Sequence, residues 1–99
     1  MTTQDTAVKW LRIPLTLIEH VDDVKGFQGL DEQRLQAVQR DYTPDEITGI
    51  VSGLRFAEAH PQYDFASLII GLNRTNAEIY PFLMKILRSL EAANLAPER

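Results

Sequence analysis

The sequence predicts an all-α fold, a single compact bundle of four to five helices. Two stretches carry the strongest indication, because Thr43 and Thr75 each stand three residues ahead of a Glu and an apolar stripe at helical spacing follows both times. This is the capping-box pattern of helix starts. An apolar content of 44% over 99 residues is enough for one core. We therefore expect one helical domain over residues 1–99, with 1–6 and 95–99 frayed.

The first elements are the least regular. Residues 7–13 alternate like a short strand, but no second strand is available to pair with it, so we expect extended chain or a short helix. Pro14 has a backbone preset for a helix start, and a helix is predicted from there to about Lys25. Gly26 and Gly29 then bracket a loop that holds Phe27.

The middle of the chain predicts two helices. Asp31 can cap a weak helix that runs to about Arg40, whose apolar stripe is narrow. Thr43 caps the next helix, from Pro44 to about His60, where Pro61 ends it. Its apolar positions follow the helical repeat and are Ile47, Ile50, Val51 and Leu54.

The C-terminal third predicts a short helix and a long one. Asp64 can cap the short helix, and Asn73 can end it in a left-handed conformation. The long helix starts near Thr75 or restarts at Pro81, and it carries the clearest amphipathic stripe of the chain. Helices at about 44–60 and 76–93 are therefore predicted to be the strongest and to form the core pair.

Two glycines inside the predicted helix 44–60 give its most informative pattern. Gly49 and Gly53 lie four residues apart, and each costs about 0.5–1 kcal/mol of helix stability relative to alanine. Such a ridge lets another backbone approach closely. One interpretation is an internal groove filled by the C-terminal helix. The other is a homodimer seam or partner cleft lined by Gly49, Gly53 and Phe56.

Three carboxylates are predicted on one outer helical face, at Glu19, Asp22 and Asp23. They form either a solvated acidic face or a docking patch for a basic partner. The alternating oxygen ligands and turn glycine of a calcium loop are missing, and so is a pair of histidines at zinc-binding spacing. We expect no metal site.

Catalysis is not predicted. The chain has no cysteine, and its two histidines, His20 and His60, have no spacing that brings them together. Its serines fall inside predicted helices rather than on a nucleophile turn. No glycine-rich phosphate loop is present. We expect a protein that is not an enzyme and needs no cofactor.

The charge and the hydropathy of the chain limit the kinds of partner that we expect. The net charge is −4, which weighs against a large nucleic-acid surface, although residues 65–99 alone carry +1. The N-terminus lacks the pattern of a signal peptide, and no apolar run approaches the roughly 18 residues of a membrane span. We expect a cytoplasmic protein that does not enter a membrane.

The C-terminal third resembles part of a known family. Residues 64–94 read as short helix, turn and longer amphipathic helix, and Leu90 and Glu91 precede Asn94 and Leu95. This is similar to the end of the recognition helix in winged helix-turn-helix regulators. The resemblance implies a DNA-binding transcriptional regulator, with contacts from Arg74, Asn76, Tyr80, Lys85 and Arg88.

The function expected from the sequence is a small acidic protein-binding module that acts as a regulator, inhibitor or adaptor. The absence of a catalytic constellation, the acidic face and the glycine ridge all favour it. Its partner would be another protein or a second copy of the chain. DNA binding by residues 64–94 is the alternative.

Overall fold

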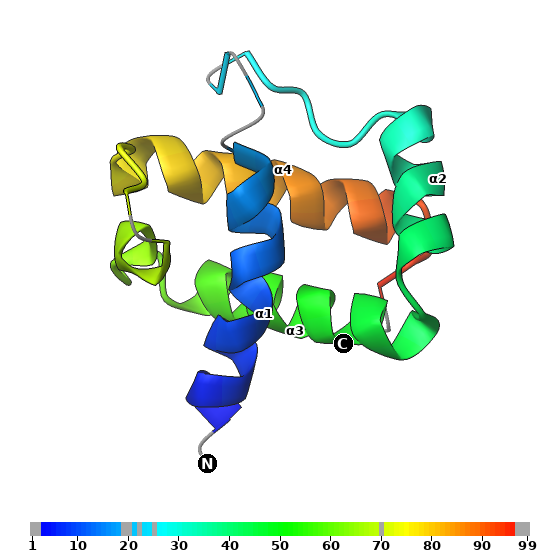
Figure 1. Cartoon of the computed structure of the whole chain (residues 1–99), viewed down its shortest axis with the longest axis horizontal. Helices are drawn as coiled ribbons and strands as arrows, with labels where there is room; N and C mark the ends of the chain where they lie inside the picture. Colours follow the sequence, from blue (N-terminus) through cyan, green and yellow to red (C-terminus); the bar gives the residue numbers. More distant parts are fainter. Residues whose placement is uncertain (1–2, 19–20, 22, 25, 70, 97–99) are drawn as a thin grey trace.

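The computed structural model describes residues 3–18, 21, 23–24, 26–69 and 71–96, and side chains from Ala7 onward. Four α-helices and one 3₁₀ helix make up the fold (Figure 1), and no strand occurs in these ranges. The elements are α1 (Thr3–Ile18), α2 (Glu32–Asp41), α3 (Pro44–Ala59), η1 (Phe65–Leu68) and α4 (Asn76–Ala92). The predicted all-α fold is confirmed.

The helices form two layers. α3 and α4 run in opposite directions and pack together at the back, whereas α1 crosses in front of both (Figure 1). The predicted pair of helices does pack, but α3 packs more extensively against α1 than against α4. α2 stands at one end of the front layer, apart from α1.

The predicted bounds of the N-terminal helix were wrong, whereas the helical alternative for residues 7–13 is confirmed. One helix runs through residues 7–13 and through Pro14, which lies in its interior, and it ends at Ile18 rather than near Lys25. Its buried positions include Ala7, Leu11 and Leu15, which recur at helical spacing. Burial of this stripe therefore outweighs the roughly 3 kcal/mol that an interior proline costs a helix.

The core lies where α1, α3 and α4 meet. Its largest fully buried side chains are Phe65 and Phe82, and Phe27 packs its ring 4.5 Å from that of Phe82. The loop of Phe27 is fixed to α4, because the Leu30 backbone N–H donates to Ser89 Oγ at 2.9 Å. The predicted loop between two glycines thus supplies part of the core.

Three predicted helix starts are confirmed at atomic detail. The Arg34 backbone N–H donates to Asp31 Oδ1 at 2.8 Å. In the first capping box, the Thr43 N–H donates to Glu46 Oε1 at 2.8 Å and the Glu46 N–H donates to Thr43 Oγ1 at 3.2 Å. At the start of α4, the Thr75 N–H donates to a carboxylate oxygen of Glu78 at 3.3 Å.

The structure differs from the prediction at both ends of the short helix η1. Asp64 precedes η1 but its side chain makes no capping hydrogen bond. The left-handed residue after η1 is Gly71, with φ of 84°, rather than Asn73. Glycine adopts this conformation without steric cost, which explains the choice. Asn94 after α4 is left-handed, with φ of 61°.

Candidate functional site

The glycine ridge of α3 is occupied within the chain. The Trp10 ring lies 2.3 Å from the place of a Cβ atom at Gly49, and the Ala7 carbonyl oxygen lies 2.7 Å from that place at Gly53. The ridge is therefore an internal groove, as the first interpretation held, but α1 fills it instead of the C-terminal helix. A partner could reach these glycines only by displacing α1.

Phe56 lies apart from that ridge. It is half-buried, its ring stacks on the His60 ring at 4.3 Å, and the Tyr63 ring meets it edge-on at 5.5 Å. The His60 ring nitrogen Nδ1 also lies 3.0 Å from the Phe56 carbonyl oxygen. Phe56 thus belongs to an aromatic cluster that closes the end of α3. The structure does not join it to Gly49 and Gly53 in one cleft.

Of the predicted acidic face, only Asp23 lies in the described residues, and it does not lie on a helix. Glu19 and Asp22 fall outside the described residues. Asp23 follows the end of α1 and is exposed, and its carboxylate accepts a hydrogen bond at 3.0 Å from the Gly26 backbone N–H. Asp23 therefore stabilises a turn in the loop after α1.

The basic residues of the DNA-binding alternative pair with acidic neighbours. Arg74 bonds to Glu78 at 3.1 Å, and Arg88 bonds to Glu91 at 2.7 Å and also to Glu58 of α3. These carboxylates raise the pKa of the Arg88 guanidinium and neutralise its charge locally. A phosphate backbone would have to compete with these ion pairs.

The other three candidates for DNA contact have structural surroundings. The Asn76 side chain accepts from the Phe65 N–H and donates to the Tyr63 carbonyl, so it connects α4 to η1. Tyr80 is half-buried against the core. Lys85 is also half-buried, and its backbone carbonyl accepts from Ser89 Oγ. None of the three presents a fully exposed side chain.

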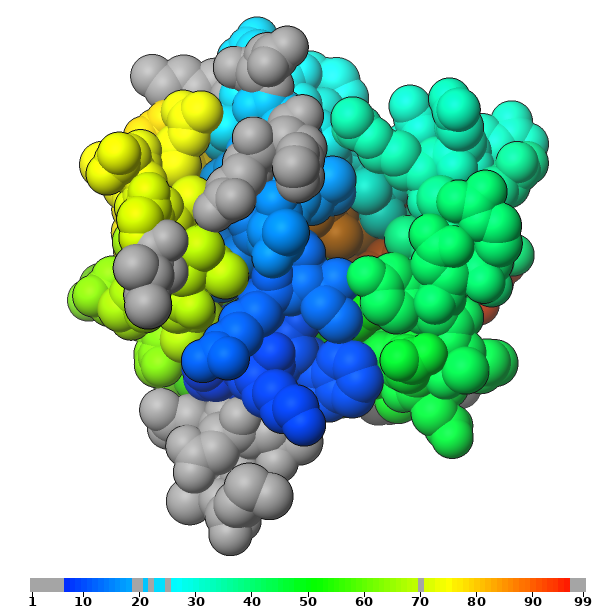
Figure 2. Space-filling model, viewed as in Figure 1, coloured from blue at the N-terminus to red at the C-terminus, as the bar shows by residue number. Residues whose placement is uncertain are grey.

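An open apolar cavity lies between α1 and α2, and we call it the α1–α2 slot. It is a cavity of about 300 Å³. In Figure 2 it appears as a hollow between these helices, with α4 visible at its floor. Its lining comes from all four α-helices and from the residues that flank α2 on either side. It comprises Ile13, Pro14, Thr16, Leu17, Leu30, Arg34, Ala37, Val38, Asp41, Tyr42, Ile47, Ile50, Ile86 and Leu90.

The slot exists because α2 does not close onto the bundle. None of its residues is buried, although Leu35, Ala37 and Val38 are half-buried on its inner side. An isolated helix of this length is marginal in water. α2 is stabilised by its Asp31 cap, by the packing of Leu35 and Val38 against the core, and by the short connection through Tyr42 to the capped start of α3.

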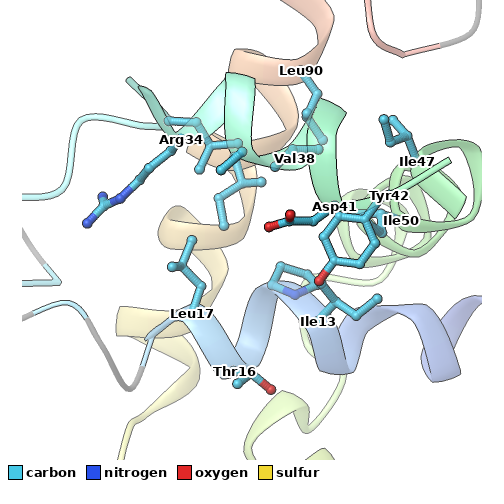
Figure 3. Close-up of a pocket in the computed structure, with 14 residues that line it drawn as sticks. Ile13, Thr16, Leu17, Arg34, Val38, Asp41, Tyr42, Ile47, Ile50 and Leu90 are labelled. Carbon is cyan, nitrogen blue, oxygen red and sulfur yellow. The ribbon is translucent and has the colours of Figure 1, made fainter. Parts of the chain in front are cut away.

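Few polar groups face the slot. The Thr16 hydroxyl already donates to the Arg12 carbonyl at 2.7 Å. Figure 3 shows the Asp41 carboxylate directed over the cavity, whereas the Arg34 side chain extends outward past its rim. Arg40 lies beside Asp41 at 3.0 Å, and this contact lowers the pKa of the carboxyl, which stays charged at neutral pH.

A second cavity continues beyond Tyr42 and Ile47, which line both. It has a volume of about 480 Å³ and reaches the segment after α4. Gln39, Thr48 and Asn94 add polar groups to its walls. The first cavity is therefore the better place for apolar side chains.

Sequence reasoning did not identify the slot as a site. The sequence does indicate the slot indirectly, through the weak helix 32–41. The apolar stripe of this helix is too narrow to bury the helix against the core. Such a helix between two well-formed elements indicates a surface that the chain leaves uncovered. The opposite wall, formed by residues 13–17 of α1, was not predicted to face this helix, because the crossing of the helices is not encoded in a local pattern.

The described residues were also compared with the patterns of a metal site and of a membrane span. No group of three or more histidine, aspartate or glutamate side chains gathers there as a set of metal ligands. None of the helices described has the length and apolar content to cross a bilayer.

No protein family, no characterised protein and no solved structure matches the chain significantly.

Proposed function

We propose that the chain is a non-enzymatic protein-binding module, and that the α1–α2 slot is its docking surface for one helix of a partner. The observation that carries the proposal is the gap in the front layer, where α1 and α2 stand apart over an apolar floor. Regulators, inhibitors and adaptors act through contacts of this kind. A helix laid into an apolar groove is a recurring mode of recognition.

The slot has the physical properties of a binding surface. Ile47, Ile50, Ile86 and Leu90 form its floor, and each contributes to the core on its other side, so the floor is rigid. Water in such a cavity finds few hydrogen-bond partners, and an apolar side chain that displaces it is favoured. A partner would also bury the inner side of α2, which the chain leaves half-exposed.

A pair of matched substitutions tests the proposal. Ala37 lines the slot from α2, whereas Ala59 is exposed at the far end of α3. Ala37→Arg places a charged side chain in the slot, and Ala59→Arg adds the same side chain elsewhere. Both variants should fold, because arginine is a good helix former.

The measurement is affinity capture with wild type and both variants, followed by titration of each purified protein with the captured partner. We expect Ala37→Arg to lose the partner and Ala59→Arg to keep it. If Ala37→Arg binds the purified partner as tightly as wild type, the slot is not the docking surface and the proposal is refuted.

A further inference from the structure

We propose that the occupant of the slot is an amphipathic helix with two neighbouring apolar anchors and with an acidic and a basic side chain seven residues apart. This inference rests on the proposed function and specifies the chemistry of its partner. It is drawn from the volume of the cavity and from the two charged residues on the α2 side of its rim.

The volume sets the number of anchors. An apolar cavity of about 150 Å³ holds one benzene ring, and the slot has a volume of about 300 Å³. It therefore takes two side chains of the size of leucine or phenylalanine. On a helix, residues three or four apart lie next to one another on the same face, about 5–6 Å apart at Cβ. Two anchors at that spacing fit one cavity.

The charges on the rim set the flanking residues. Arg34 lies in the first turn of α2 and Asp41 at its last residue, and both line the slot. Seven residues span about 10.5 Å of helix axis. A partner helix that lies along α2 would meet a positive side chain at one end and a negative one at the other. The partner helix therefore needs an acidic and a basic residue of its own, seven residues apart, to pair with these two charges.

Both rim residues are available for such pairing. Arg34 forms no ion pair with any described residue, and its guanidinium lies 6.0 Å from the Phe27 ring centroid, at the outer limit of a cation–π contact. Asp41 pairs with Arg40, but the two side chains are 55% and 75% exposed. Exposed pairs of this kind are weak and exchange readily.

This arrangement fixes the direction of the bound helix. Its acidic residue lies at the Arg34 end of the slot, and its basic residue lies at the Asp41 end. Apolar contacts alone would allow both directions. The rim charges therefore supply specificity, while the apolar floor supplies most of the affinity.

The probe is a synthetic peptide of about 16 residues, above the roughly 12–15 that an isolated helix needs. Its only apolar anchors are leucines at positions n+3 and n+6, with Glu at n and Lys at n+7 and alanine and glutamine elsewhere. At 100° per residue this places the leucines together and the two charges along one side of them. A nitroxide label at the Glu end reports direction by broadening nearby amide signals of the ¹⁵N-labelled protein.

With wild type we expect the label to broaden amides around Arg34. In the double variant Arg34→Glu, Asp41→Lys the rim charges are exchanged, so the same peptide should bind more weakly, whereas a peptide with Lys at n and Glu at n+7 should bind with the wild-type affinity and keep its labelled end near residue 34. A merely structural role of the two side chains would not be rescued by exchanging the charges of the peptide. Arg34→Glu alone should weaken binding by about two- to fivefold, the range for one exposed pair.

The outcomes separate the two proposals. If both peptides shift amides of the slot but bind wild type and the double variant equally well, the charge rule is overturned and the docking surface stands. If the peptide shifts no amide of the slot at millimolar concentration, both are overturned. A peptide with serine in place of both leucines controls for charge alone, and tight binding of it would also overturn the inference.

Discussion

Filling the slot from inside should stabilise the protein and impair its binding at the same time. Ala37 lies on the inner side of α2 and lines the cavity. Ala37→Leu adds three carbon atoms in that direction, and at about 0.8 kcal/mol per buried CH₂ group full burial would contribute roughly 2.4 kcal/mol. The slot is open on one side, so we expect about half of this, near 1 kcal/mol. Alanine and leucine have similar helix propensities, so the backbone adds little.

The assay is equilibrium unfolding in urea and by heat, followed by far-UV circular dichroism. A gain of about 1 kcal/mol corresponds to a rise of about 4–8 °C in Tm for a domain of this size. Ala59→Leu, at an exposed position of α3, is the matched control and should change Tm little. Binding of a partner helix should weaken in Ala37→Leu alone, because the leucine occupies the volume of one anchor. A native spectrum with unchanged or lower stability would refute the reasoning, since it would mean that no open apolar volume adjoins residue 37.

Three further predictions concern the elements that hold the slot in place. Gly53→Ala should lower the free energy of unfolding in urea by about 1–2 kcal/mol despite the better helix propensity of alanine, because the new methyl group meets the Ala7 carbonyl oxygen. The control Ser52→Ala, on the exposed side of the same helix, should be neutral or slightly stabilising. Equal effects of the two substitutions would contradict the close crossing of α1 and α3. Thr43→Ala removes one half of the α3 capping box and should cost about 1 kcal/mol, and no loss would mean that the cap is not formed in solution. Hydrogen bonds from the Thr75 backbone N–H, and then from Arg74, lower the pKa of Glu78, so the contribution of Glu78 to stability is present above the ordinary glutamate pKa of about 4.3 and is lost as the pH falls through the lowered value. The stability of Glu78→Gln should therefore depend less on pH below about 4 than the stability of wild type. Identical pH profiles would contradict the cap.

Local signals in the sequence were sufficient for the helices that have their own start. Asp31, Thr43 and Thr75 each cap the helix that was predicted to follow them, because a capping hydrogen bond depends only on residues three positions apart.

Predictions failed where a distant contact decides the conformation. Pro14 is a good first residue of a helix, and this local preference favoured a start eleven residues later than the observed one. Burial of Leu11 and Leu15 against α3 and α4 decides this, and it depends on the assembled bundle. The filling of the glycine ridge by Trp10 depends on the same crossing.

The candidate site was the hardest feature to predict, since it is a volume that no residue occupies. Its walls come from segments far apart in the sequence, among them Ile13, Val38 and Leu90. The sequence indicated only that helix 32–41 cannot bury itself. By contrast, residues with a chemically suggestive appearance, such as Arg74 and Arg88, pair with glutamates in the fold.

The central claim is that a partner helix docks between α1 and α2, and an amide chemical-shift map tests it most directly. The ¹⁵N-labelled protein is titrated with the Glu/Lys peptide that carries two leucine anchors. We predict that the largest shifts fall on residues 13–17, 34–42 and 86–90, which surround the slot (Figure 3). Shifts confined to the start of α4 and η1, or no shifts, would contradict the account.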